Sequence, residues 1–161
     1  MNPYAAQLGQ QNALDVIDAT PGELARLVEV LGSSGLKQSL GAGKWSAREI
    51  LCHLADTEIA FAFRLRQALA EAHHIIQPFD QDAWARSYAS CEARLALEAL
   101  AGLRRWNVGL IRHVPSETMS KPLTHPERGA MTFRVLVETM AGHDLNHLGQ
   151  LKTIAARAVS E

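Results

Sequence analysis

The positions of the prolines limit the possible fold of this chain more than any other feature. Six prolines stand at positions 3, 21, 78, 115, 122 and 126 of 161 residues, so residues 22–77, 79–114 and 127–161 contain no strong helix breaker. Alanine, leucine, glutamate, arginine and glutamine dominate these stretches, and no run of alternating β-branched residues indicates a strand. The pattern predicts an all-α fold.

Capping signals divide the first proline-free stretch into two helices. Thr20 before Pro21 is typical of a helix start, and Gly32 predicts that this helix ends near residue 31. Ser46 and Glu49 have the spacing of a capping box, in which each side chain accepts from the backbone of the other residue. A second helix is therefore expected from residue 46 to about residue 72.

Two more long helices are expected in the second half of the chain. One spans about residues 92–113 and follows a short helix or turn near residues 82–88. Thr132 could cap another, over residues 133–158, after an irregular connection at residues 115–130. Four helices with connections of moderate length predict a four-helix bundle, formed as a single domain over residues 1–161.

The near-neutral composition argues against several classes of partner. With 16 basic and 17 acidic residues, the chain has no excess of positive charge to neutralise phosphates or anionic lipids. No stretch has the roughly 18 apolar residues of a membrane span, and the N-terminus lacks the pattern of a signal peptide. We expect a cytoplasmic protein that binds neither nucleic acid nor membranes, with Cys52 and Cys91 as free thiols.

Three of the seven histidines fall on predicted apolar helix faces. His143 and His147 are one turn apart in the last helix, and His53 lies on the apolar stripe of the second helix. Three neutral imidazoles directed into one core can donate their lone pairs to a single cation. We therefore take His53, His143 and His147 as candidate metal ligands, with three hydrogen-bonded core histidines as the alternative.

The other four histidines are not expected to be ligands. His73, His74 and His113 fall near predicted helix C-termini, where a partly positive imidazole interacts favourably with the helix dipole. His125 lies between two prolines in the expected irregular connection. The aromatic residues expected in the core or in a pocket wall are Trp45, Phe79, Trp84 and Trp106.

Asp56 and Asp144 are the candidate catalytic carboxylates. Asp56 follows His53 by three residues and could hydrogen-bond its ring or a metal-bound water, although a solvated helix-face carboxylate is the alternative. Asp144 completes the sequence His-Asp-Leu-Asn-His, which is similar to the His-Glu-x-x-His helix of zinc peptidases. Aspartate is shorter than glutamate, and no His, Asp or Cys follows His147. We therefore expect Asp144 to orient a ligand or to cap a surface interaction.

Two segments resemble motifs of the DinB-like, or YfiT-like, superfamily. They are residues 44–58, Lys-Trp-Ser-Ala-Arg-Glu-Ile-Leu-Cys-His-Leu-Ala-Asp-Thr-Glu, and residues 143–151, His-Asp-Leu-Asn-His-Leu-Gly-Gln-Leu. The resemblance extends from about residue 20 to residue 151. It implies a four-helix bundle in which His53, His143 and His147 bind zinc, nickel or a similar divalent ion. It also implies a homodimer that acts on a small molecule, and it slightly favours an S-transferase with a low-molecular-weight thiol over a hydrolase.

Three functions are therefore open from the sequence. In a metal-dependent enzyme, three neutral histidines would leave the ion its full charge and an open position for water or a thiol. A non-catalytic dimeric bundle that binds a metal or a small molecule is the alternative, and a helical interaction protein without metal is the third. The missing fourth ligand favours the enzyme. Three imidazoles do not distinguish zinc, nickel, copper and iron.

Overall fold

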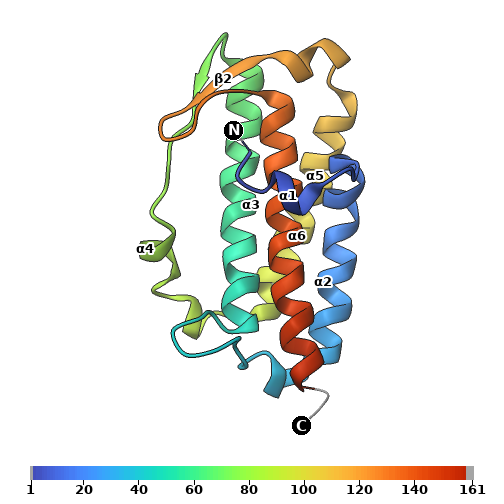
Figure 1. The fold of residues 1–161 in the computed structure, drawn as a ribbon, viewed down its shortest axis with the longest axis vertical. Helices are drawn as coiled ribbons and strands as arrows, with labels where there is room; N and C mark the ends of the chain where they lie inside the picture. The colour runs from blue at the N-terminus through green and yellow to red at the C-terminus, as the bar shows by residue number, and fades with distance from the viewer. Residues whose placement is uncertain (1, 159–161) are drawn as a thin grey trace.

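The computed structural model describes residues 2–158 and is dominated by four long helices (Figure 1). They are α2 (Ala13–Gly35), α3 (Ala47–Ala70), α5 (Ala93–His113) and α6 (Phe133–Ala158). The smaller helical elements are α1 (Ala5–Leu8), α4 (Gln81–Ala85) and two 3₁₀ turns at Tyr88–Ser90 and Ser116–Ser120. The predicted all-α class and four-helix bundle are confirmed.

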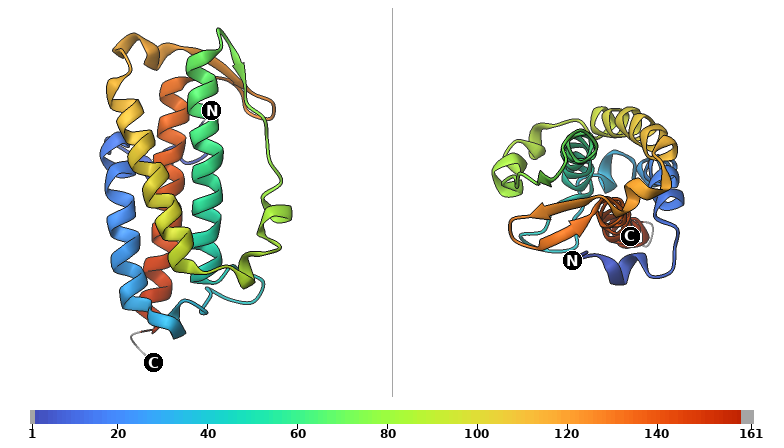
Figure 2. Two further views of the ribbon diagram at one scale, coloured as in Figure 1. Left: turned by 180° about the vertical axis from the view of Figure 1, so that it is seen from behind. Right: turned by 90° about the horizontal axis from the view of Figure 1, so that it is seen from above.

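The bundle has two pairs of parallel helices. In Figure 1, α2 and α6 run downwards while α3 and α5 run upwards. Helix α2 packs on α5 and α6, and α3 packs on the same two helices from the other side. Because α3 and α5 are parallel, residues 71–92 must return along the side of the bundle, and this crossover carries α4 (Figure 2). The arrangement makes α3 and α6 antiparallel neighbours.

A small sheet covers one end of the bundle, where no strand was predicted. It consists of β1 (His74–Ile75), β2 (Pro122–His125) and β3 (Gly129–Thr132), with β1 parallel and β3 antiparallel to β2. Leu123 is paired with Met131, and both side chains are buried in the core. Nothing in the sequence indicated these strands, because strands of two to four residues are too short to show a period of two.

Helix α2 begins earlier than predicted. The Asn12 side chain caps it, accepting hydrogen bonds from the backbone N–H groups of residues 14 and 15 at 2.9 and 3.2 Å. Thr20 is not a cap, because its hydroxyl donates to the Val16 carbonyl inside the helix at 2.9 Å. Pro21 therefore lies within α2, although proline cannot donate the usual backbone hydrogen bond to residue 17.

The other predicted boundaries are close to those observed. Ser46 and Glu49 form the predicted capping box at the start of α3. The Thr132 hydroxyl oxygen accepts from the Val135 N–H at 3.3 Å at the start of α6. Gly32 interrupts α2 with a φ of +57°, so the predicted break is correct, although one further helical turn follows it.

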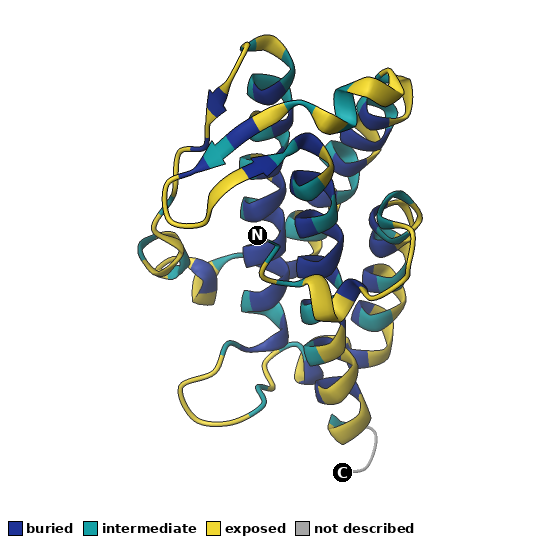
Figure 3. Cartoon of the chain, turned by 45° about the horizontal axis from the view of Figure 1, so that its top comes forward, coloured by how far each residue is buried: buried dark blue, intermediate teal, exposed yellow. Residues whose placement is uncertain are grey.

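Buried residues line the faces of the helices that point towards each other, and exposed residues lie on the outer faces and loops (Figure 3). Trp45 and Phe79 are partly buried, whereas Trp84 and Trp106 are exposed and so lie outside the core, although Trp106 lines a surface pocket. Trp106 is 69% exposed, and its ring lies 5.8 Å from the Arg66 guanidinium.

Within residues 2–158, no helix combines the length and hydropathy needed to cross a membrane.

Candidate metal centre

The structure brings together the three histidines that the helical pattern places on inward faces. His53 comes from the first half of α3, and His143 and His147 come from the middle of α6. All three are buried, and one ring nitrogen of each lies within 4.8 Å of the others. In the described part of the chain, no other group of three His, Cys, Asp or Glu side chains is close enough to share an ion.

The spacing of the ring nitrogens is close to that required by one small cation. The Nε2 atoms of His53 and His143 are 3.0 Å apart. Two nitrogens bound to one zinc ion at 2.0–2.1 Å and a tetrahedral angle are separated by about 3.3 Å. The three rings are tilted against one another by 55°, 61° and 67° rather than stacked. The donor set therefore fits a divalent metal ion.

Burial keeps the three imidazoles neutral. It lowers the pKa of His53 to about 3, with a further contribution from the neighbouring His147. Burial likewise lowers the pKa of His143 well below its ordinary value, and the other two histidines add to this effect. The pKa of His147 is lowered by the same cause. Near neutral pH, each ring thus has one bare nitrogen, as a metal ligand requires.

Contacts around the rings indicate which nitrogen faces the site. His147 Nδ1 lies 3.0 Å from Gln150 Oε1, and an amide oxygen only accepts, so Nδ1 carries the proton and Nε2 has the lone pair. His53 Nε2 faces the site, because it lies 3.0 Å from His143 Nε2. His53 Nδ1 is buried on the other side of the ring and has no hydrogen-bond partner among residues 2–158.

A buried ion network lies next to the histidines and was not predicted. Arg104 of α5 is only 2% exposed and forms salt bridges with Glu58 of α3 at 2.8 Å and Asp144 of α6 at 2.6 Å. The Asn107 amide donates to the other Glu58 oxygen at 2.8 Å. The sequence contained one indication that Arg104 is buried. Arg104 stands four residues after Leu100 and therefore lies on the apolar stripe of α5.

In the described part of the chain, neither candidate carboxylate forms a hydrogen bond with a histidine of the cluster. Asp144 is buried against Arg104, so the expectation that it caps a surface interaction was wrong, whereas a role in orienting a ligand stays a prediction. Asp56 is partly buried and accepts a hydrogen bond from the Tyr88 hydroxyl at 2.7 Å. Burial and this contact raise the pKa of Tyr88, so the hydroxyl remains a donor. A catalytic role for Asp56 or Asp144 remains a prediction.

The remaining histidines lie outside the cluster. His73 and His74 follow the end of α3 instead of lying in its last turn, and His74 is buried in β1 with Nδ1 2.8 Å from Glu71. His125 is in β2 rather than in an irregular loop, and it lies outside the histidine cluster. His113 lies in the last turn of α5, as expected, and donates to a carbonyl there.

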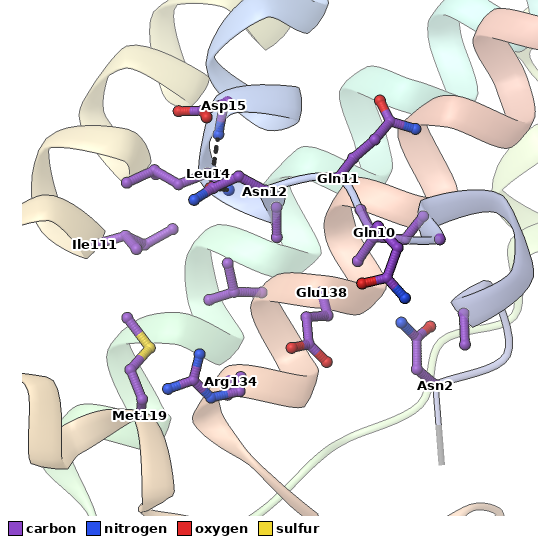
Figure 4. Close-up of a pocket in the computed structure, with 15 residues that line it drawn as sticks. Asn2, Gln10, Gln11, Asn12, Leu14, Asp15, Ile111, Met119, Arg134 and Glu138 are labelled. Atoms are coloured by element: carbon purple, nitrogen blue, oxygen red, sulfur yellow. Dashed lines mark hydrogen bonds between the residues drawn. The ribbon is translucent and has the colours of Figure 1, made fainter.

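A small cavity opens beside the histidine cluster. Its volume is about 290 Å³, and it is lined by Leu40, Gly43, Lys44, Trp45, Ile50, Asp82, His147 and Gln150. The Trp45 ring lies 4.7 Å from that of His53, so Trp45 is a wall residue, as predicted. A larger cavity of about 560 Å³ lies between residues 2–12, α2, α5 and α6 (Figure 4) and contacts none of the three histidines. The smaller cavity therefore gives access to the candidate site.

Comparison with known proteins shows a match over most of the chain. The family described as the DinB superfamily matches residues 17–151. A protein of Oceanobacillus iheyensis named "Putative metal-dependent hydrolase" is 26% identical over 145 residues, which cover 89% of this chain and 84% of the relative. A protein with the same name from Bacillus cereus strain ATCC 10987 is 25% identical over 142 residues, covering 88% and 82%.

One solved structure has the same fold. It is YfiT from Bacillus subtilis, described as "a probable metal-dependent hydrolase with an unusual four-helix bundle topology". The TM-score is 0.84 at 23% sequence identity, and the match covers 90% of this chain and 85% of YfiT. This similarity shows that the parallel pairing of α3 and α5 belongs to a known bundle topology.

Proposed function

The chain belongs to the DinB superfamily, and on this premise we propose that His53, His143 and His147 bind one divalent metal ion in a hydrolytic centre. The observation that carries the proposal is the convergence of three buried imidazoles, with two Nε2 atoms 3.0 Å apart. Zinc and nickel are the proposed ions, because both bind imidazole nitrogen and the resemblance to the superfamily motifs implies an ion of this kind. The names of the relatives support a hydrolase.

The burial of the three histidines and the contacts around them favour a cation at this site. Burial holds the imidazoles neutral, so an ion bound by them keeps its full charge. Such an ion supplies Lewis acidity and a water-derived nucleophile near neutral pH. Gln150 holds the Nδ1 proton of His147 away from the site. The Asp144 carboxylate favours positive charge at His147 and so supports a cation at that side of the site.

The neighbouring cavity suggests the size of the substrate. At about 290 Å³ it lies at the lower end of the range for ligand pockets. Trp45 provides an apolar wall, while Lys44 and Asp82 bring one charge of each sign to the rim. We therefore propose a small substrate with both apolar and polar parts, which reaches the site past His147.

Metal content of tag-free protein is the first test of this proposal. We expect one divalent ion per chain, and loss of that ion when His53, His143 or His147 is replaced by alanine. His113→Ala is the matched control, because His113 is exposed and outside the cluster. A wild-type chain without stoichiometric metal, or an alanine variant that retains it, would contradict the site.

A substrate screen then distinguishes the possible functions. Metal-dependent cleavage of activated esters or amides supports the hydrolase. Metal-dependent consumption of a low-molecular-weight thiol together with an electrophile would instead support the S-transferase that the resemblance favours. A protein that binds stoichiometric metal but catalyses neither reaction would be a non-catalytic metal-binding bundle, and the hydrolase proposal would then be wrong.

A further inference from the structure

The N-terminal segment, residues 2–12, lies against the bundle close to the histidine cluster. It precedes the residues that match the DinB superfamily, which begin at residue 17. In Figures 1 and 2 this segment crosses α6, and α1 packs on that helix. Leu8 anchors it with a side chain that is only 7% exposed. The Tyr4 carbonyl accepts from the N–H groups of Gln7 and Leu8 at 3.1 Å, which holds Tyr4 in a defined turn.

Gly142 allows this segment to approach α6 closely. A Cβ atom on Gly142 would lie 2.5 Å from the Tyr4 Cβ and 2.6 Å from the Tyr4 carbonyl oxygen, both far inside van der Waals contact. The second of these atoms is backbone, so a change of side-chain rotamer could not remove the clash. The segment therefore keeps this position only with glycine at position 142, directly before the ligand candidate His143.

The close approach places the Tyr4 ring against His143. The ring centroids are 5.4 Å apart, and the planes meet at 77°, an edge-to-face contact. Phe61 of α3 makes a second edge-to-face contact with His143 at 6.2 Å. Tyr4 and Phe61 thus limit the rotation of the His143 imidazole, and Tyr4 helps to exclude water from it.

We propose that the N-terminal segment forms a wall of the metal centre, in which Tyr4 is a positioning residue for His143. This inference rests on the proposed metal function, because it assigns the Tyr4 contact a role in retaining the ion. To release the ion, His143 must rotate or water must reach its Nε2 atom, and the Tyr4 ring opposes both. The segment therefore slows metal loss without contributing a ligand.

The experiment measures how fast the metal-loaded protein loses zinc to an excess of chelator. Wild-type protein is compared with Tyr4→Ala, Gly142→Ala and the double variant. Each single variant is expected to lose zinc about tenfold faster. Outer-shell changes typically lower metal affinity by that factor or more, and we expect the loss to appear in the rate of release, because the segment opposes release. The double variant should be no faster than the faster single variant, because both substitutions remove the same contact.

Two control variants separate this effect from general changes in stability. Gly149→Ala replaces another glycine of α6. Apart from the adjacent residues and the local backbone of α6, no atom of residues 2–158 lies within 4 Å of the new Cβ, so the substitution changes helix propensity without a clash. Tyr4→Phe keeps the aromatic ring that contacts His143. Both are expected to release zinc at the wild-type rate. The visible spectrum of the cobalt-loaded protein provides a second readout, and it should change in Tyr4→Ala but not in Tyr4→Phe.

The results that would contradict the proposed metal site differ from those that would contradict the role of the N-terminal segment. Wild-type protein that binds no stoichiometric zinc refutes the proposed function. Wild-type protein that binds zinc, with Tyr4→Ala and Gly142→Ala releasing it within twofold of the wild-type rate, refutes only the role of the segment. Effects of the two substitutions that multiply in the double variant also refute that role, because they would arise from separate contacts.

Discussion

The guanidinium of Arg104 donates a hydrogen bond of 2.7 Å to the carbonyl oxygen of Ile17, one turn before Pro21. In a regular helix the N–H of residue 21 would donate to this oxygen, but proline has no N–H. Burial by itself would lower the pKa of Arg104, but its two carboxylate partners outweigh this effect and raise it. One buried cation thus stabilises the interrupted helix α2 and also links α5 to α3 and α6.

This relationship predicts coupling between Pro21 and Arg104. In Arg104→Met, the Ile17 carbonyl is left buried without either donor. Pro21→Ala restores the backbone donor, so it should stabilise Arg104→Met by about 1 kcal/mol more than it stabilises the wild-type protein. Urea unfolding of the four proteins measures the difference. Equal effects of Pro21→Ala in both backgrounds would show that Arg104 does not compensate for the proline.

Arg104→Met is also expected to destabilise the protein strongly. Methionine has a similar length but leaves Glu58 and Asp144 as buried charges, which typically costs about 3–5 kcal/mol. Arg112→Met is the control, because Arg112 pairs with Asp18 at 2.7 Å with both side chains about half exposed. Its cost should be within about 1 kcal/mol. Similar free energies of unfolding for the two variants would contradict a structural role for the buried network.

Gln150→Leu should weaken metal binding while leaving all three ligands in place. Gln150 accepts the Nδ1 proton of His147, and loss of such a partner typically lowers metal affinity 10–100-fold, about 1.4–2.7 kcal/mol. Gln67→Leu is a matched change on α3, where the amide contacts Glu71 instead of a histidine. Competition with a chromophoric chelator measures the affinity. If both variants bind zinc equally well, Gln150 does not orient the ligand.

The metal-free protein should lose stability as the pH falls below about 6.5. The pKa of His53 is about 3 in the folded protein and near 6.5 when unfolded, so between these values the unfolded chain binds more protons. The His53 contribution is complete above pH 6.5 and falls by about 1.4 kcal/mol per pH unit below it.

Denaturant unfolding at pH 7, 6 and 5 measures this dependence. His53→Leu should make the profile less steep, while the lowered pKa values of His143 and His147 preserve part of the slope. Parallel profiles for wild-type protein and His53→Leu would show that His53 is not held neutral by burial.

Several elements could be predicted because their signals are local. The capping box of Ser46 and Glu49 and the Thr132 cap each act within one turn, and they correctly place the starts of α3 and α6. The start of α2 was misplaced because the compensation for Pro21 comes from Arg104, 87 residues from Ile17. The sheet was missed because its strands have only two to four residues, and because β1 pairs with β2 across about 50 residues.

The sequence by itself determined that His53, His143 and His147 face inward, because a period of 3.6 residues places each side chain on a known face of its own helix. It did not determine what each face meets. Only the tertiary structure brought His53 Nε2 to 3.0 Å from a ring 90 residues away, turned Asp144 towards Arg104 and laid Tyr4 against His143. These contacts depend on the order, direction and rotation of packed helices, which are set by the whole core and not by any local pattern.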